Sequence, residues 1–284
     1  MKKIRFISNP NSGVSFDPYL ENTIGLSFDR NHYLVDYKLT EGVGHCKVLA
    51  KEAVDLGYDL VVAVGGDGTI NEIASSLAHS KTALGIIPRG SGNGLSNHLK
   101  IPKNTLKALE VIKKGKIKEI DTARINEDRF VNISGWGFEA SIAHKFDEYK
   151  DRGFWRYLKL VLKSFKESSS FTYLANGKEE KAWQITIANG SQYGNNVKIA
   201  PQADLADGFL EFLVLDKPNF IQAIKLAYAM YLGKPLPKAR KVSIQNINLV
   251  LEKVAGHIDG EILKDQGPAY KIEIDPQSLR VIVP

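Results

Sequence analysis

The chain has 284 residues, of which 43% are hydrophobic, and this is enough apolar material for two hydrophobic cores or one large one. It contains one cysteine, which excludes an internal disulfide and a metal site built from clustered cysteines. The formal charge of +6 suits an anionic membrane or a phosphorylated substrate; no nucleic-acid-binding module is recognisable, so we expect no nucleic-acid partner. Neither a run of about 20 apolar residues nor a signal-peptide pattern occurs, and we therefore expect a cytoplasmic protein.

Up to about residue 120, expected strands alternate with expected helices, which is typical of a parallel α/β domain. The strands are expected at 3–8, 33–40, 60–64 and 83–87, and the main helices at 45–56, 70–77, 95–99 and 104–114. A further helix is expected to begin at Asp17 as its N-cap, with Pro18 at its first position. Cys46 lies on the apolar side of the helix at 45–56, where it is expected to fill the core.

A glycine-rich turn, from Gly65 to Thr69, joins the strand at 60–64 to the helix at 70–77. Its three glycines allow close approach to a ligand, and the positive end of the following helix favours an anion such as phosphate. The carboxylate of Asp67 would repel a bare phosphate, so the turn predicts a nucleotide bound together with Mg2+. A tight turn with nothing bound is the alternative. A second glycine-rich turn, from Pro88 to Gly94, follows another strand of the same expected sheet and favours the nucleotide hypothesis.

From about residue 123 the pattern becomes that of a mainly antiparallel β domain. Hairpins are expected around three turns, with arms at 120–125 and 129–133, at 171–175 and 182–188, and at 255–258 and 261–263. Further strands are expected at 197–200, 209–215, 242–251, 270–274 and 279–283. We therefore predict an α/β fold with a nucleotide-binding domain at 1–122 and a β-rich domain at 123–278. In such proteins the active site commonly lies between the two domains.

Two helices are expected within the β domain, at 153–166 and 219–232. The first carries a cationic stripe formed by Arg156, Lys159, Lys163 and Lys166. The second is apolar over most of its surface and is followed by a basic segment at 234–241. Both helices could simply cover a sheet, with lysines that reach solvent; alternatively, they could contact an anionic bilayer or cover an apolar substrate.

Four motifs occur in a fixed order: Asn9-Pro-Asn-Ser-Gly13, Gly65-Gly-Asp-Gly-Thr-Ile-Asn-Glu72, Pro88-Arg-Gly-Ser-Gly-Asn93 and Asp259-Gly-Glu261. Over nearly the whole chain, this set resembles the diacylglycerol kinase catalytic-domain family, which includes sphingosine, ceramide and bacterial lipid kinases. The resemblance implies a kinase that uses ATP and Mg2+ to phosphorylate a hydroxyl of a membrane lipid. It also implies a first domain similar to phosphofructokinase and NAD kinase, peripheral membrane contact, and a last strand, 279–284, that returns to the first domain.

The resemblance also implies roles for individual residues. Asp259 matches the proton acceptor, Glu261 belongs to the same motif, and Asp121 matches a required carboxylate at the domain junction. The nucleotide site would be formed by Asn9, Thr40, Gly65, Gly66, Asp67, Gly68, Thr69, Ile70, Asn71 and Ser91. The ligands of a bound Mg2+ would be Asp204, Asp207 and the carbonyl group of Phe209.

Several alternatives stay open at the level of sequence. Asp259 also belongs to a common Asp-Gly hairpin turn, and Asp67 is a rival base because sphingosine kinases are described with that role for the equivalent aspartate. Asp204 and Asp207 also fit simple turns. Gly94 replaces an aspartate found in many family members, which leaves the acceptor open between diacylglycerol and a sphingoid or ceramide-like alcohol. An NAD kinase and a catalytically silent lipid-binding protein are the alternative functions.

Overall fold

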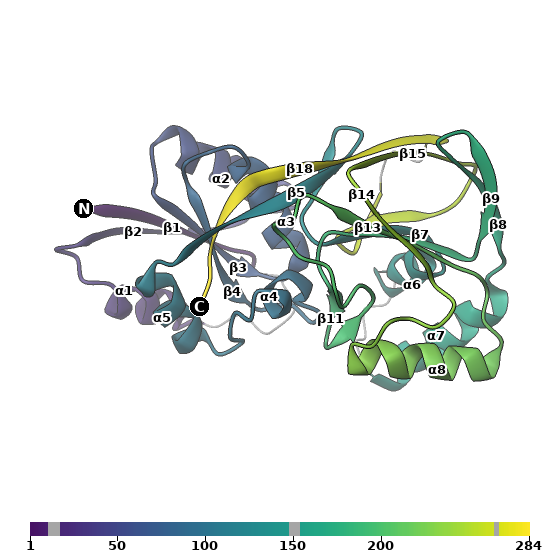
Figure 1. The fold of residues 1–284 in the computed structure, drawn as a ribbon. Helices are drawn as coiled ribbons and strands as arrows, with labels where there is room; N and C mark the ends of the chain where they lie inside the picture. Colours follow the sequence, from purple (N-terminus) through teal and green to yellow (C-terminus); the bar gives the residue numbers. More distant parts are fainter. Residues whose placement is uncertain (11–17, 148–153, 264–266) are drawn as a thin grey trace. The chain divides into compact units, whose positions relative to one another are not determined.

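The computed structural model describes residues 1–10, 18–147, 154–263 and 267–284, with side chains for all of these except 143–147 and 154–159. Residues 11–13 of the first motif and the expected cap Asp17 lie outside this part, as do the side chains of Arg156 and Lys159. The chain divides into two compact units (Figure 1). The first unit comprises Met1–Thr122, Tyr193–Asn195 and Pro276–Pro284, and the second Ala123–Gln192 and Asn196–Asp275. The sequence analysis assigns residues 193–195 to the β domain, whereas their contacts lie with the first unit.

The first unit is built on a parallel sheet with strand order β2-β1-β3-β4, which confirms the predicted α/β class. Its strands are β1 (Lys2–Ser8), β2 (Tyr33–Leu39), β3 (Leu60–Gly65) and β4 (Ala83–Pro88). Every residue of β3 and β4 is buried, as expected for central parallel strands covered on both faces. Val281 near the C-terminus pairs in parallel with Leu84 of β4.

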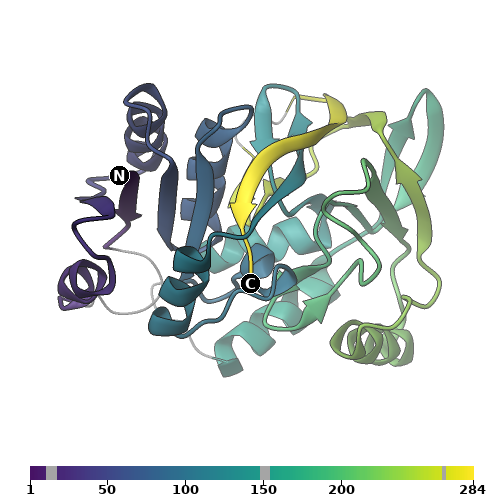
Figure 2. The same ribbon diagram turned by 60° about the vertical axis from the view of Figure 1, so that its left-hand side comes forward.

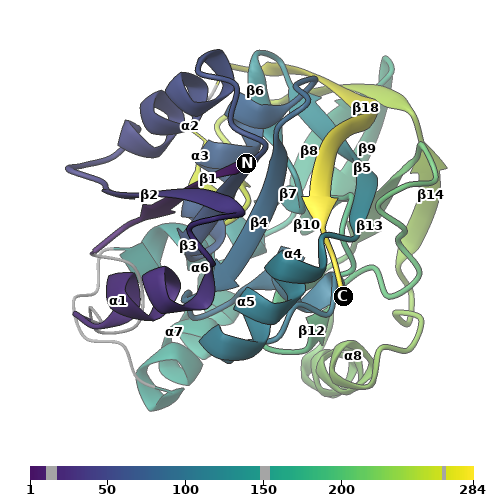
Figure 3. The same cartoon turned by 90° about the vertical axis from the view of Figure 1, so that its left-hand side faces the viewer.

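Helices cover both faces of this sheet (Figure 3). On one face, α1 (Leu20–Ser27) and α5 (Thr105–Lys114) share a core with Phe6, Val62 and Val64. On the other face lie α2 (His45–Asp55) and α3 (Asp67–Leu77), while α4 (Gly94–His98) follows β4. The predicted start of α1 is wrong: the helix begins at Leu20, with Tyr19 as N-cap, and Pro18 precedes it. Leu20 and Ile24 are its buried residues, so burial of this pair determines where the helix lies on the sheet.

Cys46 of α2 is 3% exposed, which agrees with its expected role in the core. Burial, and to a smaller extent the neighbouring Glu72 carboxylate, together raise the pKa of its thiol to about 12. Because such a thiol is almost wholly protonated at about pH 8, we expect no reaction of the native protein with iodoacetamide and full alkylation in urea. Mass spectrometry of the alkylated protein measures this difference. Rapid alkylation of the native protein would contradict the buried placement.

The second unit is an antiparallel β sandwich, which confirms the predicted class of a mainly antiparallel β domain. One sheet has the order β14-β13-β10-β7-β16-β17, and the other strands, β18, β15, β8 and β9 together with β5 and β6, belong to the ten-stranded sheet that also contains β2-β1-β3-β4. The strands of the first sheet are β14 (Arg240–Ile244), β13 (Leu210–Leu215), β10 (Gln184–Ala188), β7 (Ile133–Gly137), β16 (Gly256–Ile258) and β17 (Glu261–Ile262). The other strands are β18 (Ala269–Ile282), β15 (Asn246–Leu251), β8 (Phe171–Ala175), β9 (Lys178–Ala182), β5 (Ile117–Ile125) and β6 (Asp128–Phe130). Side chains of both sheets form one core, in which Trp136 lies against Tyr270 with ring centroids 5.0 Å apart.

Several strand boundaries differ from the prediction. The turn at Asn176-Gly177 is confirmed, but its second arm is the charged β9 rather than 182–188. The charges suit β9 because it is the last strand of its sheet and has an unpaired edge. The wholly buried β10 lies in the other sheet. The single strand expected at 242–251 is two strands, β14 and β15, which lie in different sheets. The strand expected at 129–133 is also divided, because β6 ends at Phe130 and Ile133 begins β7.

The two last expected strands form one long strand, β18, which starts in the second unit and ends in the first. Figure 2 shows β18, in yellow, beside its partner β5. The helices of the second unit are α6 (Phe138–Asp147), which the sequence analysis missed, α7 (Phe154–Glu167) and α8 (Phe220–Leu232). Within the described part of the chain, no helix has both the length and the apolar character needed to cross a membrane. A short hairpin, β11 (Gln192–Gly194) and β12 (Val197–Lys198), completes the fold.

Candidate functional site

The first candidate region lies at the carboxyl edge of the parallel sheet. Ser8 pairs with Leu39 and with Val64, and Gly65 pairs with Pro88, so the four strands end at one level. The backbone N–H of Thr40 donates to Ser8 (3.0 Å) and that of Asn9 to Val64 (3.3 Å). The structure therefore brings the predicted nucleotide-site positions together from four loops: Asn9, Thr40, residues 65–71 and Ser91.

The first glycine-rich turn is shorter than predicted, because α3 begins at Asp67 rather than at Ile70. Gly66 is the N-cap, and as a glycine it has no side chain to accept the N–H groups of the first helical turn. Those groups lack intrahelical acceptors, which makes this end of α3 the candidate anion site. Ile70 offers little to a ligand, because its side chain is buried and its N–H donates to Gly66 (3.0 Å).

The two glycine-rich turns touch each other through their backbones. A Cβ atom on Gly90 would lie 2.5 Å from the Cα of Gly66, and a Cβ on Gly66 would lie 3.0 Å from the Cα of Gly90. A Cβ on Gly65 would lie 2.5 Å from Oγ1 of Thr69. A side chain at position 66 or 90 would separate the turns, so these two glycines are required for the contact as well as for access by a ligand, whereas Gly65 leaves room for Thr69 of its own turn.

Asp67 joins the two turns. Its Oδ2 accepts the N–H of Asn93 and its Oδ1 the N–H of Gly94, both at 2.8 Å. The carboxylate thus caps the N-terminus of α4, and it occupies the N–H groups of Asn93 and Gly94, which could otherwise have bound a phosphate. The negative charge of Asp67, from which we expect a bound cation, has another explanation in the structure, because it meets two N–H donors.

The second turn is closed by Asn93, which the sequence analysis did not single out. Asn93 has a left-handed conformation (φ 55°), accepts the N–H of Gly90 (2.9 Å) and donates to the carbonyl of the same residue (2.6 Å). Gly194 packs on the turn so closely that a Cβ would lie 2.4 Å from the carbonyl oxygen of Gly92. This contact accounts for the assignment of residues 193–195 to the first unit.

Asp121 is buried at the end of the first unit. Its Oδ1 accepts the N–H of Gln277 (2.7 Å), and the neighbouring hydroxyl of Thr122 lies 2.7 Å from that of Ser278. Gln277 has a left-handed conformation (φ 50°), so its hydrogen bond to Asp121 stabilises an irregular backbone conformation within β18. The contacts of Asp121 thus show a structural role; its predicted part in catalysis stays a prediction.

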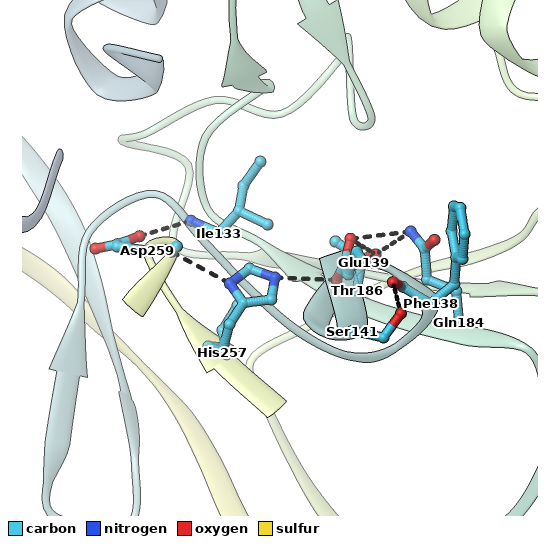
Figure 4. Close-up of polar contacts among 10 residues, drawn as sticks. Ile133, Phe138, Glu139, Ser141, Gln184, Thr186, His257 and Asp259 are labelled. Atoms are coloured by element: carbon cyan, nitrogen blue, oxygen red, sulfur yellow. Dashed lines mark hydrogen bonds and ion pairs between the residues drawn. The ribbon is translucent and has the colours of Figure 1, made fainter. Parts of the chain in front are cut away.

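Asp259 lies in the second unit, in the hairpin turn expected from its Asp-Gly sequence. Asp259 and Gly260 have φ values of 48° and 89° and join β16 to β17, as in a two-residue hairpin turn. The side chain is nevertheless 8% exposed and turned inward. Its Oδ1 accepts the N–H groups of Asn132 and Ile133, and its Oδ2 that of Val131, all at 2.9 Å; Figure 4 draws the bond from Ile133. Three backbone donors therefore hold the carboxylate in one orientation and stabilise its charge. Glu261, the other acid of the motif, is exposed.

A buried polar cluster adjoins this turn (Figure 4). The Nδ1 atom of His257 accepts the N–H of Gly260 (3.2 Å), so the ring proton is assigned to Nε2, which lies 3.3 Å from Oε1 of Glu139. Glu139 also accepts hydrogen bonds from Gln184 (2.9 Å) and Thr186 (3.1 Å). Burial raises the pKa of Glu139, although the contacts with His257 and Thr186 act in the opposite direction. Glu139 fits only beside a glycine, because a Cβ at position 135 would lie 1.5 Å from its Oε1.

Replacement of Glu139 by glutamine should reveal the raised pKa of this buried carboxyl group through the pH dependence of stability. Because the folded state raises the pKa of Glu139, the folded protein holds this proton more tightly than the unfolded chain. That contribution to stability is complete below the ordinary value of 4.5 and is lost as the pH rises through the folded-state pKa. We expect the free energy of unfolding of Glu139→Gln, measured with urea from about pH 4.5 to pH 7, to rise relative to the unmodified protein. Parallel curves would contradict a raised pKa of Glu139 in the folded protein.

The predicted metal ligands lie in the loop before β13. Asp204 accepts the N–H of Ala206 (3.1 Å) and Asp207 that of Phe209 (3.0 Å), which are local turns of the kind that aspartate favours. Two carboxylates and one carbonyl are oxygen donors of the kind Mg2+ prefers, so the residues fit the ion in chemistry. Within the described ranges, no group of three His, Cys, Asp or Glu side chains could hold a metal.

Two family models together match nearly the whole chain. Residues 3–125 match the diacylglycerol kinase catalytic domain, and residues 132–283 match the YegS C-terminal NAD kinase beta sandwich-like domain. The diacylglycerol kinase of Bacillus subtilis (strain 168) is 30% identical over 281 residues, which cover 92% of this chain and 90% of that protein.

Solved structures share the fold. A diacylglycerol kinase from Bacillus anthracis str. Sterne superposes with a TM-score of 0.75 at 22% identity, over 100% of this chain and 97% of that one. An NAD kinase from Archaeoglobus fulgidus superposes with a TM-score of 0.53 at 14% identity, over 98% and 93% of the two chains. The mostly parallel α/β unit followed by an antiparallel β sandwich is therefore a fold with solved examples.

Proposed function

Because the chain belongs to the diacylglycerol kinase catalytic-domain family, we propose that it is an enzyme that transfers the terminal phosphoryl group of ATP to a hydroxyl of a membrane lipid. The observation that carries the proposal is the pair of glycine-rich turns at the carboxyl edge of the parallel sheet. Their backbones touch at Gly66 and Gly90, and the uncapped N-terminus of α3 begins there.

In this proposal the first unit binds ATP. The N–H groups at the start of α3 bind phosphate oxygens, and the absence of a Cβ at Gly66 lets them approach. Asn9, Thr40, Asn71 and Ser91 supply polar groups around the same edge. Asp67 keeps the second turn in place and does not bind phosphate itself, since its oxygens accept N–H groups of that turn.

Asp259 is the proposed proton acceptor. As the lipid hydroxyl oxygen attacks the terminal phosphorus, a new P–O bond forms, the bond from that phosphorus to the bridging oxygen breaks, and ADP leaves. The hydroxyl proton passes to the Asp259 carboxylate. Three backbone donors keep that carboxylate in one orientation, which favours alignment with an acceptor group. Mg2+, when bound, would neutralise charge on the phosphates, and Asp204, Asp207 and the carbonyl of Phe209 are its proposed ligands.

We further propose that diacylglycerol is the preferred acceptor, because the 30% identical relative from Bacillus subtilis is a diacylglycerol kinase. A sphingoid or ceramide-like alcohol is the second candidate, supported by Gly94 after Asn93. Such lipids reside in bilayers, so the protein would work in the cytoplasm as a peripheral membrane protein. An NAD kinase activity has less support, because its structural likeness rests on a TM-score of 0.53 at 14% identity.

Transfer of radiolabelled phosphate from ATP to separate samples of diacylglycerol, sphingosine, ceramide and NAD tests the proposal. We expect label on a lipid, dependent on Mg2+ and greatly reduced in Asp259→Asn. Label on NAD alone would overturn the lipid kinase assignment. Binding of ATP with no labelled acceptor would favour a silent lipid-binding protein. Mass spectrometry of lipids that copurify with the protein would identify the acceptor class independently.

A further inference from the structure

Large apolar side chains are exposed along α8. Phe220, Ile224 and Tyr228 are 67%, 56% and 62% exposed, and Ile221, Tyr231 and Leu232 are also exposed. The sequence spacing of Phe220, Ile224, Tyr228 and Tyr231 is four, four and three residues, which places them in one stripe along the helix. A stripe of this kind is unfavourable in water, and its presence indicates a contact surface.

The helix that carries the stripe has well-defined ends. Asn219 and Gln222 form a reciprocal capping box, and Gly233 ends the helix in a left-handed conformation (φ 65°). Ala229 on the opposite side is buried, and Asn196 donates a hydrogen bond to the carbonyl of Tyr231 (3.2 Å). The exposed stripe is therefore presented by a formed helix that contacts the β11–β12 hairpin (Figure 1).

The charge around the stripe is of one sign. Residues 217–241 contain no Asp or Glu and six basic residues, namely Lys217, Lys225, Lys234, Lys238, Arg240 and Lys241. Arg240 pairs with Glu180, and Lys241 pairs with Glu211 at 3.0 Å. Lys225, Lys234 and Lys238 are exposed and form no ion pair with the residues that the structure describes. Apolar and aromatic side chains flanked by unopposed lysines are typical of helices that lie in an anionic lipid interface.

We propose that α8 docks the protein onto an anionic bilayer, with the stripe among the acyl chains and the three lysines at the headgroups. Two tyrosines suit the boundary, where a ring can be apolar and its hydroxyl hydrated. A second copy of the chain fits less well, because a symmetric contact through α8 would bring two segments of the same positive charge together. The docking surface deepens the proposed function, since a lipid kinase must reach its acceptor, but the binding itself needs neither ATP nor catalysis.

The apolar part is tested with Phe220→Gln, Ile224→Gln and Tyr228→Gln combined, since glutamine keeps helix propensity. A matched control replaces Leu26, Val48 and Leu106, which are 91%, 63% and 59% exposed on helices of the first unit, by glutamine. Cosedimentation with vesicles of phosphatidylcholine and phosphatidylglycerol in equal parts measures binding without ATP. We expect affinity to fall at least about tenfold in the α8 variant and to be unchanged in the control.

The charge part is tested with Lys225→Gln, Lys234→Gln and Lys238→Gln combined, against Lys100→Gln, Lys103→Gln and Lys107→Gln on the first unit. We expect the α8 set to lose about fivefold in affinity for each lysine, and added salt or pure phosphatidylcholine vesicles to weaken binding of the unmodified protein. Circular dichroism checks that all variants are folded.

Unchanged vesicle binding in the apolar α8 variant would overturn the proposal. So would a dimer, seen by analytical ultracentrifugation, that dissociates in the same variant, because a second copy would then cover the stripe. Kinase assays with a short-chain acceptor in detergent distinguish failure of the docking proposal from failure of the proposed lipid kinase function. An α8 variant should keep that activity and lose activity only on vesicles, whereas a protein that is not a lipid kinase would still bind vesicles through α8.

Discussion

Asp259→Asn is expected to lower kcat by about a hundredfold to ten-thousandfold, the range typical of losing a positioned general base. The amide cannot take the proton of the lipid hydroxyl, whereas it occupies nearly the same volume as the carboxylate. Binding of ATP should change little, because the proposed contacts with ATP come from the first unit. Steady-state kinetics with saturating lipid, together with calorimetric titration of ATP, measures the two effects separately.

The same substitution also has a structural effect that needs its own control. One oxygen becomes an NH2 group, which must face a backbone N–H of residues 131–133 and should destabilise the fold by about 1–3 kcal/mol. Asn176 offers a matched position: it precedes Gly177 in a turn of the same kind, and its side chain accepts the N–H of Asn248 (3.0 Å). Asn176→Ala should lower stability without lowering kcat. A kcat of Asp259→Asn within a few-fold of the unmodified value would refute the base assignment.

Asp67→Asn is expected to weaken ATP binding by about tenfold or more and to destabilise the first unit by about 1–3 kcal/mol. The amide can accept only one of the two N–H groups that the carboxylate accepts, and its own NH2 would oppose the other. The second glycine-rich turn would then loosen beside the start of α3. Calorimetric titration of ATP and thermal unfolding measure the two changes.

Asp59→Asn is the matched control, because Asp59 lies at the opposite end of β3 and accepts the N–H of Lys3 (2.7 Å). It should reduce stability and leave ATP binding unchanged. If Asp67→Asn keeps both stability and ATP binding but loses turnover, Asp67 is the base and Asp259 is a turn residue. Both aspartates accept backbone N–H groups in the folded protein, so a loss of stability alone does not distinguish them. The effects on ATP binding and on kcat do.

Local features of the sequence were sufficient to predict most elements of the first unit. Apolar runs without polar interruption, such as β3 and β4, are buried on both faces and belong to a parallel sheet. Caps such as Asn104, which accepts the N–H of Lys107 (3.1 Å), determine helix ends through contacts between near neighbours in the chain. These interactions form within a few residues, so a reader of the sequence can recognise them.

Strand partners in the second unit depended on tertiary structure. β9 is charged and looks like a loop in isolation, yet it is an edge strand because β8 pairs with it. The apolar run that contains β14 and β15 is divided because its two parts join different sheets. Pairing energies arise between distant segments, and the same local pattern is compatible with several partners.

The sequence by itself determined the family, the order of the motifs and the chemistry that those motifs allow. Only the tertiary structure decided what their side chains contact. Asp67 binds the amides of Asn93 and Gly94, and Glu139 meets His257, which is 118 positions away in the chain. Neither contact has a sequence signal, because burial of a polar group requires a partner that the fold brings from elsewhere. The glycine at position 135 leaves room for the Glu139 side chain, but this can be recognised only when the position of α6 is known.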